Sequence, residues 1–282
     1  MNRKARSIMS KLLTNIVIIV IGFAMLYPVL WLFSASFKVP NTIFGDAGLI
    51  PKAFTWDNYA KGWKGIGIYS FGTFFKNSFV ISLLCVAANA LFCSLTAYAF
   101  ARLDFVGKKV WFAVMLVTMM LPGHVTTIPR YVLFNTFGWI NTFLPFVVPR
   151  ILATDAFFIF LLVQFIRGLP RELDESAVMD GCNKLTVYWR ILMPLTVPAL
   201  ITTVLFTFLW TWDDFFNQLL YLTRPELFTV PLGLRLFLDS SGISSWGSLF
   251  AMSVLSLIPC FVLFLSLQKY FVRGIATTGI KG

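Results

Sequence analysis

Residues 167–194 read RGLPRELDESAVMDGCNKLTVYWRILMP, a polar stretch that separates two long apolar runs. It carries eight charged side chains, whereas the flanking runs, about residues 143–166 and 195–222, carry only four between them. Each run is long enough for a helix to cross a lipid bilayer, which takes about 20 mostly apolar residues. The stretch is therefore predicted to be a polar loop between two membrane-spanning helices.

The composition of the whole chain is that of a polytopic membrane protein. Of its 282 residues, 58% are apolar and only 12% are charged, which is about half the charged share of a soluble domain. One soluble core of this size could not bury so much apolar surface. The four cysteines have neither metal-ligand nor disulfide spacing, so free thiols are predicted. The net charge of +11 points to membrane orientation and anionic lipids, with no nucleic acid as a partner.

Six membrane-spanning helices are predicted from the apolar runs. With rounded limits they are residues 12–37, 77–101, 110–129, 143–166, 195–222 and 247–271. The predicted organisation is a tail 1–11, a first span 12–37, an outer segment 38–75, a core 76–272 and a tail 273–282. With the N-terminus inside, the inner segments hold 14 basic and 5 acidic residues, against 9 and 7 elsewhere. This excess of basic residues predicts that both termini are cytoplasmic.

Two features between the third and fourth runs predict irregular structure. Pro122 and Pro129 lie within the third run, and proline interrupts the hydrogen bonds of a helix, so a bent third span is expected. Residues 131–142 contain Gly138 and two asparagines, which predicts a short interfacial helix or a bend.

The loop 167–194 is predicted to fold as a helix, a turn and a second helix. Pro170 is well placed for a helix start. The first turn is acidic, where the helix dipole favours negative charge, with Glu172, Asp174 and Glu175. Ala177 and Gly181 form a face with little bulk, and Gly181 suits a helix C-terminus because glycine accepts a left-handed backbone or a close partner. A second amphipathic stretch follows and is expected to stop at Pro194.

Three short motifs in this loop follow a pattern that is typical of one family of transport proteins. The motifs are Glu175-Ser176-Ala177, then Asp180-Gly181, then Ile191-Leu192-Met193-Pro194. They resemble the Glu-Ala-Ala opening, the Asp-Gly pair and the Ile-x-x-Pro close of the EAA loop in permeases of binding-protein-dependent ABC importers. Ser176 and Cys182 stand where that family usually has alanine, and both are small.

Further motifs resemble the carbohydrate-uptake branch of this family, which includes the maltose permeases. They are Leu26-Tyr27-Pro28, Ser36-Phe37-Lys38, Trp56-Asp57-Asn58-Tyr59, Asn77-Ser78, Ala101-Arg102-Leu103, Ile128-Pro129, Trp212-Asp213-Asp214-Phe215 and Phe271-Val272-Arg273-Gly274. The resemblance covers the chain nearly end to end.

The resemblance implies an all-α integral membrane protein with six transmembrane helices in the type I ABC importer permease fold. It implies a place in the bacterial cytoplasmic (inner) membrane and a role in importing a carbohydrate, in particular an oligosaccharide. The implied partners are a second permease subunit, two ATP-binding cassette subunits and an extracytoplasmic sugar-binding protein. The EAA loop would dock on the ATPase and transmit a rigid-body movement. The residues implied in this coupling are Glu172, Glu175, Ser176, Ala177, Asp180, Gly181 and Pro194.

The source of energy is expected to lie outside this chain. The sequence has no G-x-x-x-x-G-K-[ST] phosphate loop. The chain is therefore predicted not to be an enzyme and to bind no cofactor of its own, with ATP and magnesium on the partner ATPase subunits. The resemblance also implies that the tail 273–282 reaches towards the ATPase, whereas its composition alone fits a frayed end.

Polar residues recur at helical spacing along the fifth apolar run. The stripe is Thr203, Thr207, Trp210, Asp214, Asn217 and Tyr221. Intramembrane carboxylates usually face a bundle interior or water, and an aromatic ring mixed with hydroxyl, amide and carboxylate groups suits a sugar. The first five are therefore candidates for the translocation path. The alternative is that Asp213, Asp214 and Asn217 lie near the outer interface and cap or hold neighbouring helices.

Asp155, about halfway along the fourth run, is another candidate for the translocation path. Arg150 lies five residues before it. On one continuous helix that spacing separates the two side chains by about 140°, so a direct pair is not expected. Asp155 is expected either to line the aqueous path or to hydrogen-bond a residue of another span.

Three other functions fit parts of the sequence. The chain could be the permease of a non-sugar importer of the same family. A polytopic membrane enzyme would need further carboxylates or histidines beside Asp213 and Asp214 to hold a metal. A stand-alone ion-coupled transporter would normally show internal repeats, and none is visible in this sequence. Neither of the last two accounts for the loop 167–194.

Overall fold

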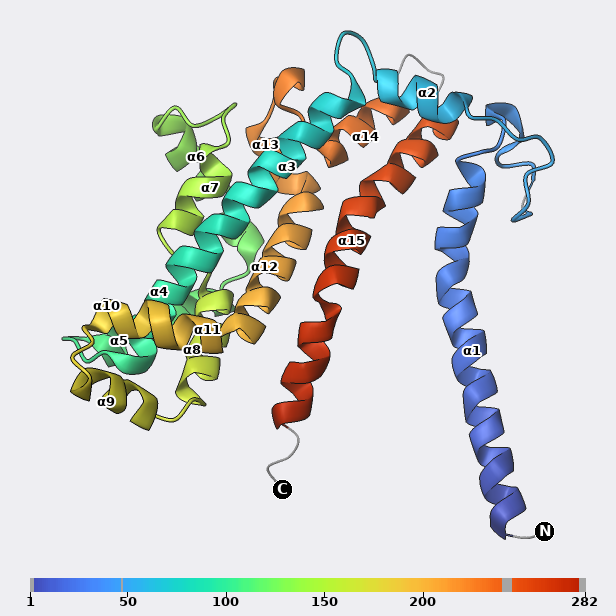
Figure 1. Ribbon diagram of the computed structural model, residues 1–282. Helices are drawn as coiled ribbons and strands as arrows, with labels where there is room; N and C mark the ends of the chain where they lie inside the picture. The colour runs from blue at the N-terminus through green and yellow to red at the C-terminus, as the bar shows by residue number, and fades with distance from the viewer. Residues whose placement is uncertain (1–2, 47, 240–244, 279–282) are drawn as a thin grey trace. The chain divides into compact units, whose positions relative to one another are not determined.

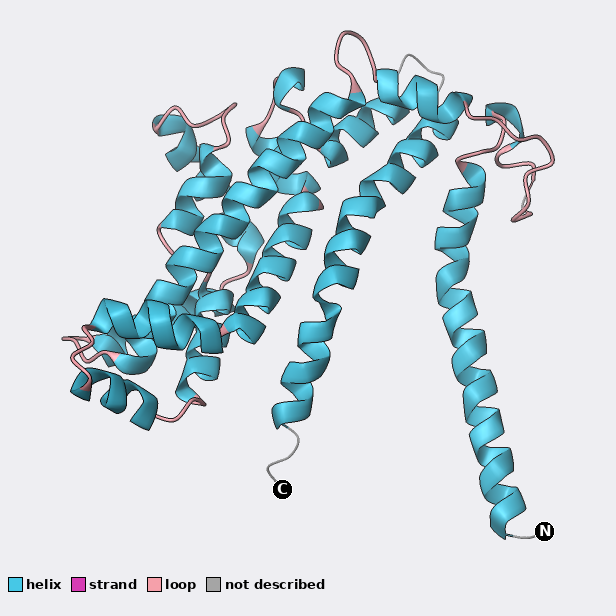
Figure 2. Ribbon diagram, in the orientation of Figure 1, coloured by secondary structure: helices cyan, strands magenta, loops and turns pink. Residues whose placement is uncertain are grey.

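The computed structural model describes residues 3–46, 48–239 and 245–278, and in those residues the regular structure is helical (Figure 2). The α-helices are α1 (Arg3–Ala35), α2 (Asp57–Lys64), α3 (Phe71–Ala88), α4 (Ser94–Arg102), α5 (Lys108–Met120), α6 (Thr127–Thr136), α7 (Leu144–Ile151), α8 (Ala156–Arg167), α9 (Glu172–Met179), α10 (Lys184–Val187), α11 (Met193–Leu195), α12 (Val197–Trp212), α13 (Phe215–Tyr221), α14 (Val230–Asp239) and α15 (Trp246–Thr278). The 3-10 helices are η1 (Pro40–Thr42), η3 (Gly123–Thr126) and η5 (Pro225–Leu227), and the π-helical turns are η2 (Asn89–Cys93) and η4 (Tyr188–Leu192).

Four helical segments of the described chain are long and apolar enough to cross a membrane. They are Lys11–Ala35, Phe71–Arg102, Leu144–Arg167 and Trp246–Tyr270. Two bent pairs pass the same test, which raises the number to six when each pair counts as one span. The pairs are Lys108–Met120 with Gly123–Thr136, bent by 99°, and Lys184–Leu195 with Val197–Trp212, bent by 77°.

The bend predicted in the third span is confirmed. Helix α5 ends at Met120, and the chain turns through Pro122 before α6 begins. The fifth span differs from the expected continuous helix over residues 195–222, because α12 ends at Trp212 and the short α13 starts at Phe215. Periodicity across residues 213 and 214 therefore carries no information about which side chains share a face.

The chain divides into two compact units, and the first combines Met1–Phe71 with Leu234–Leu257. Its helix α1 leaves large apolar side chains exposed along most of its described length. At the end of α1, the buried ammonium group of Lys38 donates hydrogen bonds to the carbonyl oxygens of Asp46 (2.5 Å) and Gly48 (2.7 Å). This lysine orders the loop that follows, since a buried charge is stable only when its donors are satisfied.

The second unit combines Gly72–Gly233 with Ile258–Gly282 and contains the loop and the polar residues singled out above. Its core forms where α4 packs against α8, with the fully buried Ala97, Leu162 and Val163 at the contact. The small alanine lets the two helices approach closely, as is common in membrane bundles. In Figure 1, α9 and α10 lie at one end of this unit, and α6 and α13 lie at the other.

Candidate functional site

The polar loop contains the helix that its acidic residues predicted. Helix α9 starts at Glu172 with three carboxylates in its first turn, and Asp180 follows its last residue. Gly181 has a φ of +82°, and a Cβ built there would meet nothing within 4 Å. The glycine is therefore needed for its left-handed backbone, since the described part of the chain places no neighbour against it.

An ion pair between two elements holds this loop against the membrane bundle. Arg102, the last residue of α4, places its Nε 2.7 Å from the Asp174 carboxylate and donates from Nη2 to the Leu169 carbonyl at 2.8 Å. Burial raises the pKa of the Asp174 carboxyl, and the positive charge of Arg102 opposes that rise. Because the Asp174 carboxylate on α9 pairs with the Arg102 guanidinium on α4, this ion pair fixes the orientation of α9.

Two tyrosine hydrogen bonds tie the second half of the loop to α4. The Tyr98 hydroxyl donates to the Lys184 carbonyl at 3.0 Å, and the Tyr188 hydroxyl lies 2.7 Å from the Ser94 hydroxyl. Ala177 of α9 is buried as well, with 4% of its surface exposed. The loop is therefore fixed to α4 by polar contacts and shares an apolar core with α8, so a force on it would reach both helices.

The remaining coupling residues lie on the exposed side of this loop. They are Glu172, Glu175, Ser176, Asp180, Gly181 and Pro194. Next to them Met179 is 87% exposed, so this surface offers both carboxylates and an apolar side chain. Pro194 does not end the second helix as expected: it lies inside α11 (Met193–Leu195), and the change of direction follows at Thr196.

Arg150 and Asp155 form an ion pair, so the prediction that they are too far apart to pair is wrong. Arg150 Nε lies 3.4 Å from Asp155 Oδ2. Helix α7 ends at Ile151 and α8 begins at Ala156, with Ala153 between them in a left-handed conformation (φ 53°). The expected separation of about 140° assumed an unbroken helix, and the break turns the two side chains towards each other.

Asn89 joins this ion pair to a third segment and was not singled out from the sequence. Its side-chain amide, fully buried on the π-turn η2, donates to Asp155 Oδ2 at 2.6 Å and to the Thr207 hydroxyl at 3.1 Å. Arg150 also donates from Nη2 to the Thr211 hydroxyl at 3.4 Å. An asparagine in the middle of an otherwise apolar span was the available signal, because such residues face a bundle interior.

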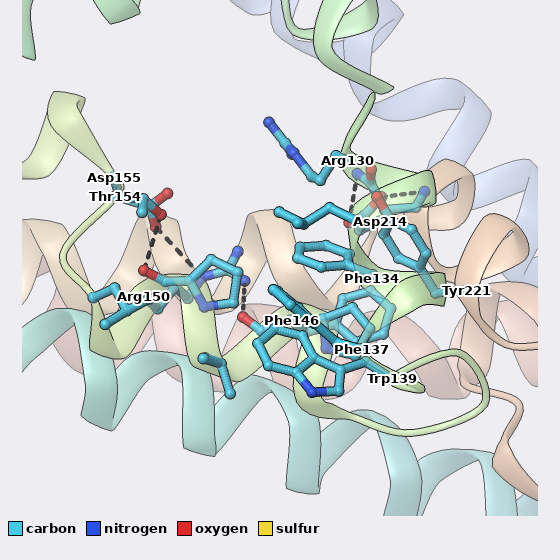
Figure 3. Close-up of a pocket in the computed structure, with 16 residues that line it drawn as sticks. Arg130, Phe134, Phe137, Trp139, Phe146, Arg150, Thr154, Asp155, Asp214 and Tyr221 are labelled. Carbon is cyan, nitrogen blue, oxygen red and sulfur yellow. Dashed lines mark hydrogen bonds and ion pairs between the residues drawn. The ribbon is translucent and has the colours of Figure 1, made fainter. Parts of the chain in front are cut away.

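A cavity of roughly 430 Å³ lies beside this network, between α6, α7 and α13 (Figure 3). Its aromatic side chains are Phe134, Phe137, Trp139, Phe146 and Tyr221. Figure 3 shows these rings gathered on one side, with Thr154 and Asp155 on the other. Asp155 and Asp214 both line this cavity, which the sequence left undecided.

Asp214 and Asn217 serve a local role at the start of α13. The Asp214 carboxylate accepts from the backbone N–H of Asn217 at 3.1 Å and from its side-chain amide at 3.0 Å. Asp214 therefore caps α13, which is one of the two roles considered from the sequence, and it also lines the cavity. Both residues therefore present partly satisfied polar groups to the cavity.

The other members of the stripe lie along one face of α12, which is continuous from Val197 to Trp212, but their environments differ. The Thr203 hydroxyl is fully buried and donates to the Ala199 carbonyl at 3.2 Å. Thr207 accepts from Asn89, and Trp210 is 51% exposed. The expected stripe does not continue to Asp214 on one helix, because α12 ends at Trp212. No group of three or more possible metal ligands occurs among the described residues.

An all-helical bundle with a rigid polar loop at one end and a polar cavity between broken helices is the construction of a multi-pass transport protein. The family described as "Binding-protein-dependent transport system inner membrane component" matches residues 90–277, about two-thirds of the chain. This chain belongs to that family and is a membrane component of such a transport system. The matched range includes both the loop and the cavity.

Relatives over the full length have related descriptions. The chain is 34% identical over 286 residues to the arabinooligosaccharides transport system permease protein AraQ of Halalkalibacterium halodurans, with 100% of both chains covered. It is 30% identical to the trehalose/maltose transport system permease protein MalG of Thermococcus litoralis, with 98% of each covered. The crystal structure of a bacterial ABC transporter that imports the acidic polysaccharide alginate has a chain with the same fold (TM-score 0.84, 21% identity, 96% and 99% covered).

Proposed function

We propose that this chain is a permease subunit of an ATP-driven importer that moves an oligosaccharide from an extracytoplasmic binding protein into the cytoplasm. The observation that carries the proposal is the full-length similarity to permeases named for arabinooligosaccharide and for trehalose and maltose transport. The mixture of aromatic rings with carboxylate, amide and guanidinium groups around the cavity supports a sugar as the cargo.

The proposed assembly contains a second permease subunit, two ATP-binding cassette subunits and a sugar-binding protein, in the bacterial inner membrane with both termini of this chain cytoplasmic. The polar loop supports this arrangement, because its exposed carboxylates and Met179 form a surface for a partner while Arg102 and two tyrosines anchor it. ATP and magnesium would be held by the cassette subunits. In this arrangement the loop transmits their closure to α4 and α8.

The decisive experiment is ATP hydrolysis by the complex that co-purifies with the tagged chain. The complex is reconstituted in lipid with its binding protein and challenged with arabinotriose, maltotriose, trehalose and, as non-sugar probes, an amino acid and a dipeptide. Stimulation by one sugar supports the proposal. Stimulation by a non-sugar probe alone would assign the chain to the non-sugar importers of the family. A purified complex that contains no ATPase would refute the proposed coupling to ATP hydrolysis.

Gly181 provides a sharper test of the coupling loop. Replacing it with Val forces a β-branched side chain into a left-handed backbone, which costs about 1–2 kcal/mol and distorts the turn after α9. Sugar-stimulated ATP hydrolysis by Gly181→Val should be lost while the subunit still inserts and assembles. The matched control is Gly181→Asn, since asparagine accepts this backbone. If Gly181→Val keeps the sugar-stimulated ATP hydrolysis of Gly181→Asn, the loop does not couple.

A further inference from the structure

A second cavity, of roughly 630 Å³, adjoins the one in Figure 3. The two share Arg130, Arg150, Thr154 and Asp155, so these four residues stand where one cavity meets the other. The second cavity adds an exposed indole ring, that of Trp210. Its volume lies within the roughly 300–1,000 Å³ that is usual for small-molecule sites.

One oxygen of the Asp155 carboxylate is held and the other is left for a ligand. Oδ2 accepts from Asn89 at 2.6 Å and lies 3.4 Å from the Arg150 guanidinium. Oδ1 has no hydrogen-bond partner among the described residues, and the side chain is 33% exposed. Although Asp155 precedes α8, it does not cap that helix. A carboxylate fixed through one oxygen is an oriented acceptor for a hydroxyl group.

Trp210 supplies a flat apolar surface on the wall of the same cavity. Phe157, Phe158 and Phe206 pack around its ring with centroid separations of 5.7, 5.4 and 5.5 Å. These contacts fix the indole, yet 51% of the residue stays exposed. A fixed ring can stack on the C–H face of a sugar without paying much conformational entropy.

Arg130 brings hydrogen-bond donors from a different helix. Its Nη2 donates to the Thr126 hydroxyl at 3.0 Å. The other N–H groups of the guanidinium have no partner in the described part of the chain, and the residue is exposed. Figure 3 shows the Arg130 side chain extending into the space between Asp214 and Asp155. A guanidinium in that place can donate to the ring and hydroxyl oxygens of a sugar.

We infer that the second cavity is a saccharide subsite of this subunit itself, in which a sugar ring stacks on Trp210, donates a hydroxyl to Asp155 Oδ1 and accepts from Arg130. The inference rests on the proposed function and adds a place of contact to it. Such a subsite would hold the oligosaccharide during passage, so that this chain recognises its cargo instead of only enclosing it. The required chemistry is a ring with free hydroxyl groups and one apolar face.

The test uses the reconstituted complex with its binding protein and whichever of arabinotriose, maltotriose and trehalose stimulates ATP hydrolysis most in the wild type. A diazirine derivative of that sugar is photolysed during turnover, and labelled peptides are identified by mass spectrometry. Labelling is expected at Phe157 or within the peptide that carries Trp210. Label found only on the partner permease overturns the inference and leaves the proposed function intact. A wild type that responds to no sugar rejects the proposed function instead.

Uptake by variants gives a second readout. Asp155→Asn and Trp210→Ala should each lower kcat/KM for sugar uptake about tenfold or more, since each loses one contact with the sugar. Trp210→Phe keeps a ring that can stack on the sugar and should recover most of the loss, whereas a purely structural role would also lower the thermal unfolding midpoint of Trp210→Ala. The control is Trp111→Ala, which removes another exposed indole, 62% exposed on α5, and should change nothing. Losses in Trp111→Ala equal to those in Trp210→Ala would overturn the inference.

Discussion

Asp155 and Asp214 occupy the same kind of position, yet their carboxylates do different things. Each directly precedes a helix that resumes after a break, α8 for Asp155 and α13 for Asp214. Asp214 caps its helix by accepting from the Asn217 backbone, whereas Asp155 turns away from its helix to Asn89 and Arg150. The comparison shows that a local capping preference gives way when a buried amide and a guanidinium offer stronger partners.

The largest expected effect comes from removing the cation on the Asp155 side. Arg150→Met leaves the Asp155 carboxylate without its ion partner and removes the donors to Phe146 and Thr211. The complex should lose about 3 kcal/mol of stability, because a partly buried charge is left uncompensated. The measurement is the thermal unfolding midpoint of the purified complex.

Arg130→Met is the matched control for that substitution. Arg130 lies on the same cavity but is exposed and bonds only Thr126 among the described residues, so its loss should cost less than about 1 kcal/mol. A double variant, Arg150→Met with Asp155→Leu, should recover part of the stability that Arg150→Met loses. Equal losses of stability for Arg150→Met and Arg130→Met would show that the ion pair with Asp155 does not stabilise the complex.

The next largest effect is expected at Asn89. Asn89→Leu removes the donor that serves both Asp155 and Thr207 at a fully buried site, which should cost about 2 kcal/mol. Asn217→Leu, which removes a side-chain donor to Asp214 but keeps the backbone donor, should cost less than half as much. The same thermal midpoint decides between them, and a reversed order would show that Asp155 does not depend on Asn89.

A smaller effect is expected at Asp214. Asp214→Ala removes the cap of α13 and should lower stability by about 1 kcal/mol, whereas Asp214→Ser keeps a capping oxygen and should lose only a few tenths. Asp155→Ser should not show this rescue, because its carboxylate does not cap α8. If serine fails to rescue position 214, the cap is not what stabilises α13.

The smallest effect concerns the left-handed backbone at the α7–α8 break. Ala153 has a φ of 53°, which costs a residue with a side chain about 1 kcal/mol relative to glycine. Ala153→Gly should therefore raise the thermal midpoint slightly. Ala156→Gly, in the first turn of α8, should lower it by up to about 1 kcal/mol. If the thermal midpoint falls equally for Ala153→Gly and Ala156→Gly, the left-handed backbone at Ala153 is not strained.

The loop was the most predictable part of the candidate site. Its helix start, acidic first turn and terminal glycine are local features, and α9 and Gly181 agree with them. The cavity was less predictable, because its side chains come from segments far apart in the sequence. The sequence predicts no pair between Arg150 and Asp155, because the helix break between them is not visible in an apolar run.

The sequence by itself determined that the chain enters the membrane several times, where its polar loop lies and how α9 starts and ends. These follow from residue type and spacing within a single segment, where the rules of helix geometry hold. Only the tertiary structure decided that Asn89, Arg150 and Asp155 meet, that Trp210 lies on a cavity, and that Asp214 caps a new helix. The physical reason is that buried polar groups take the best partner in space, and breaks in α-helices reset which side chains can face each other.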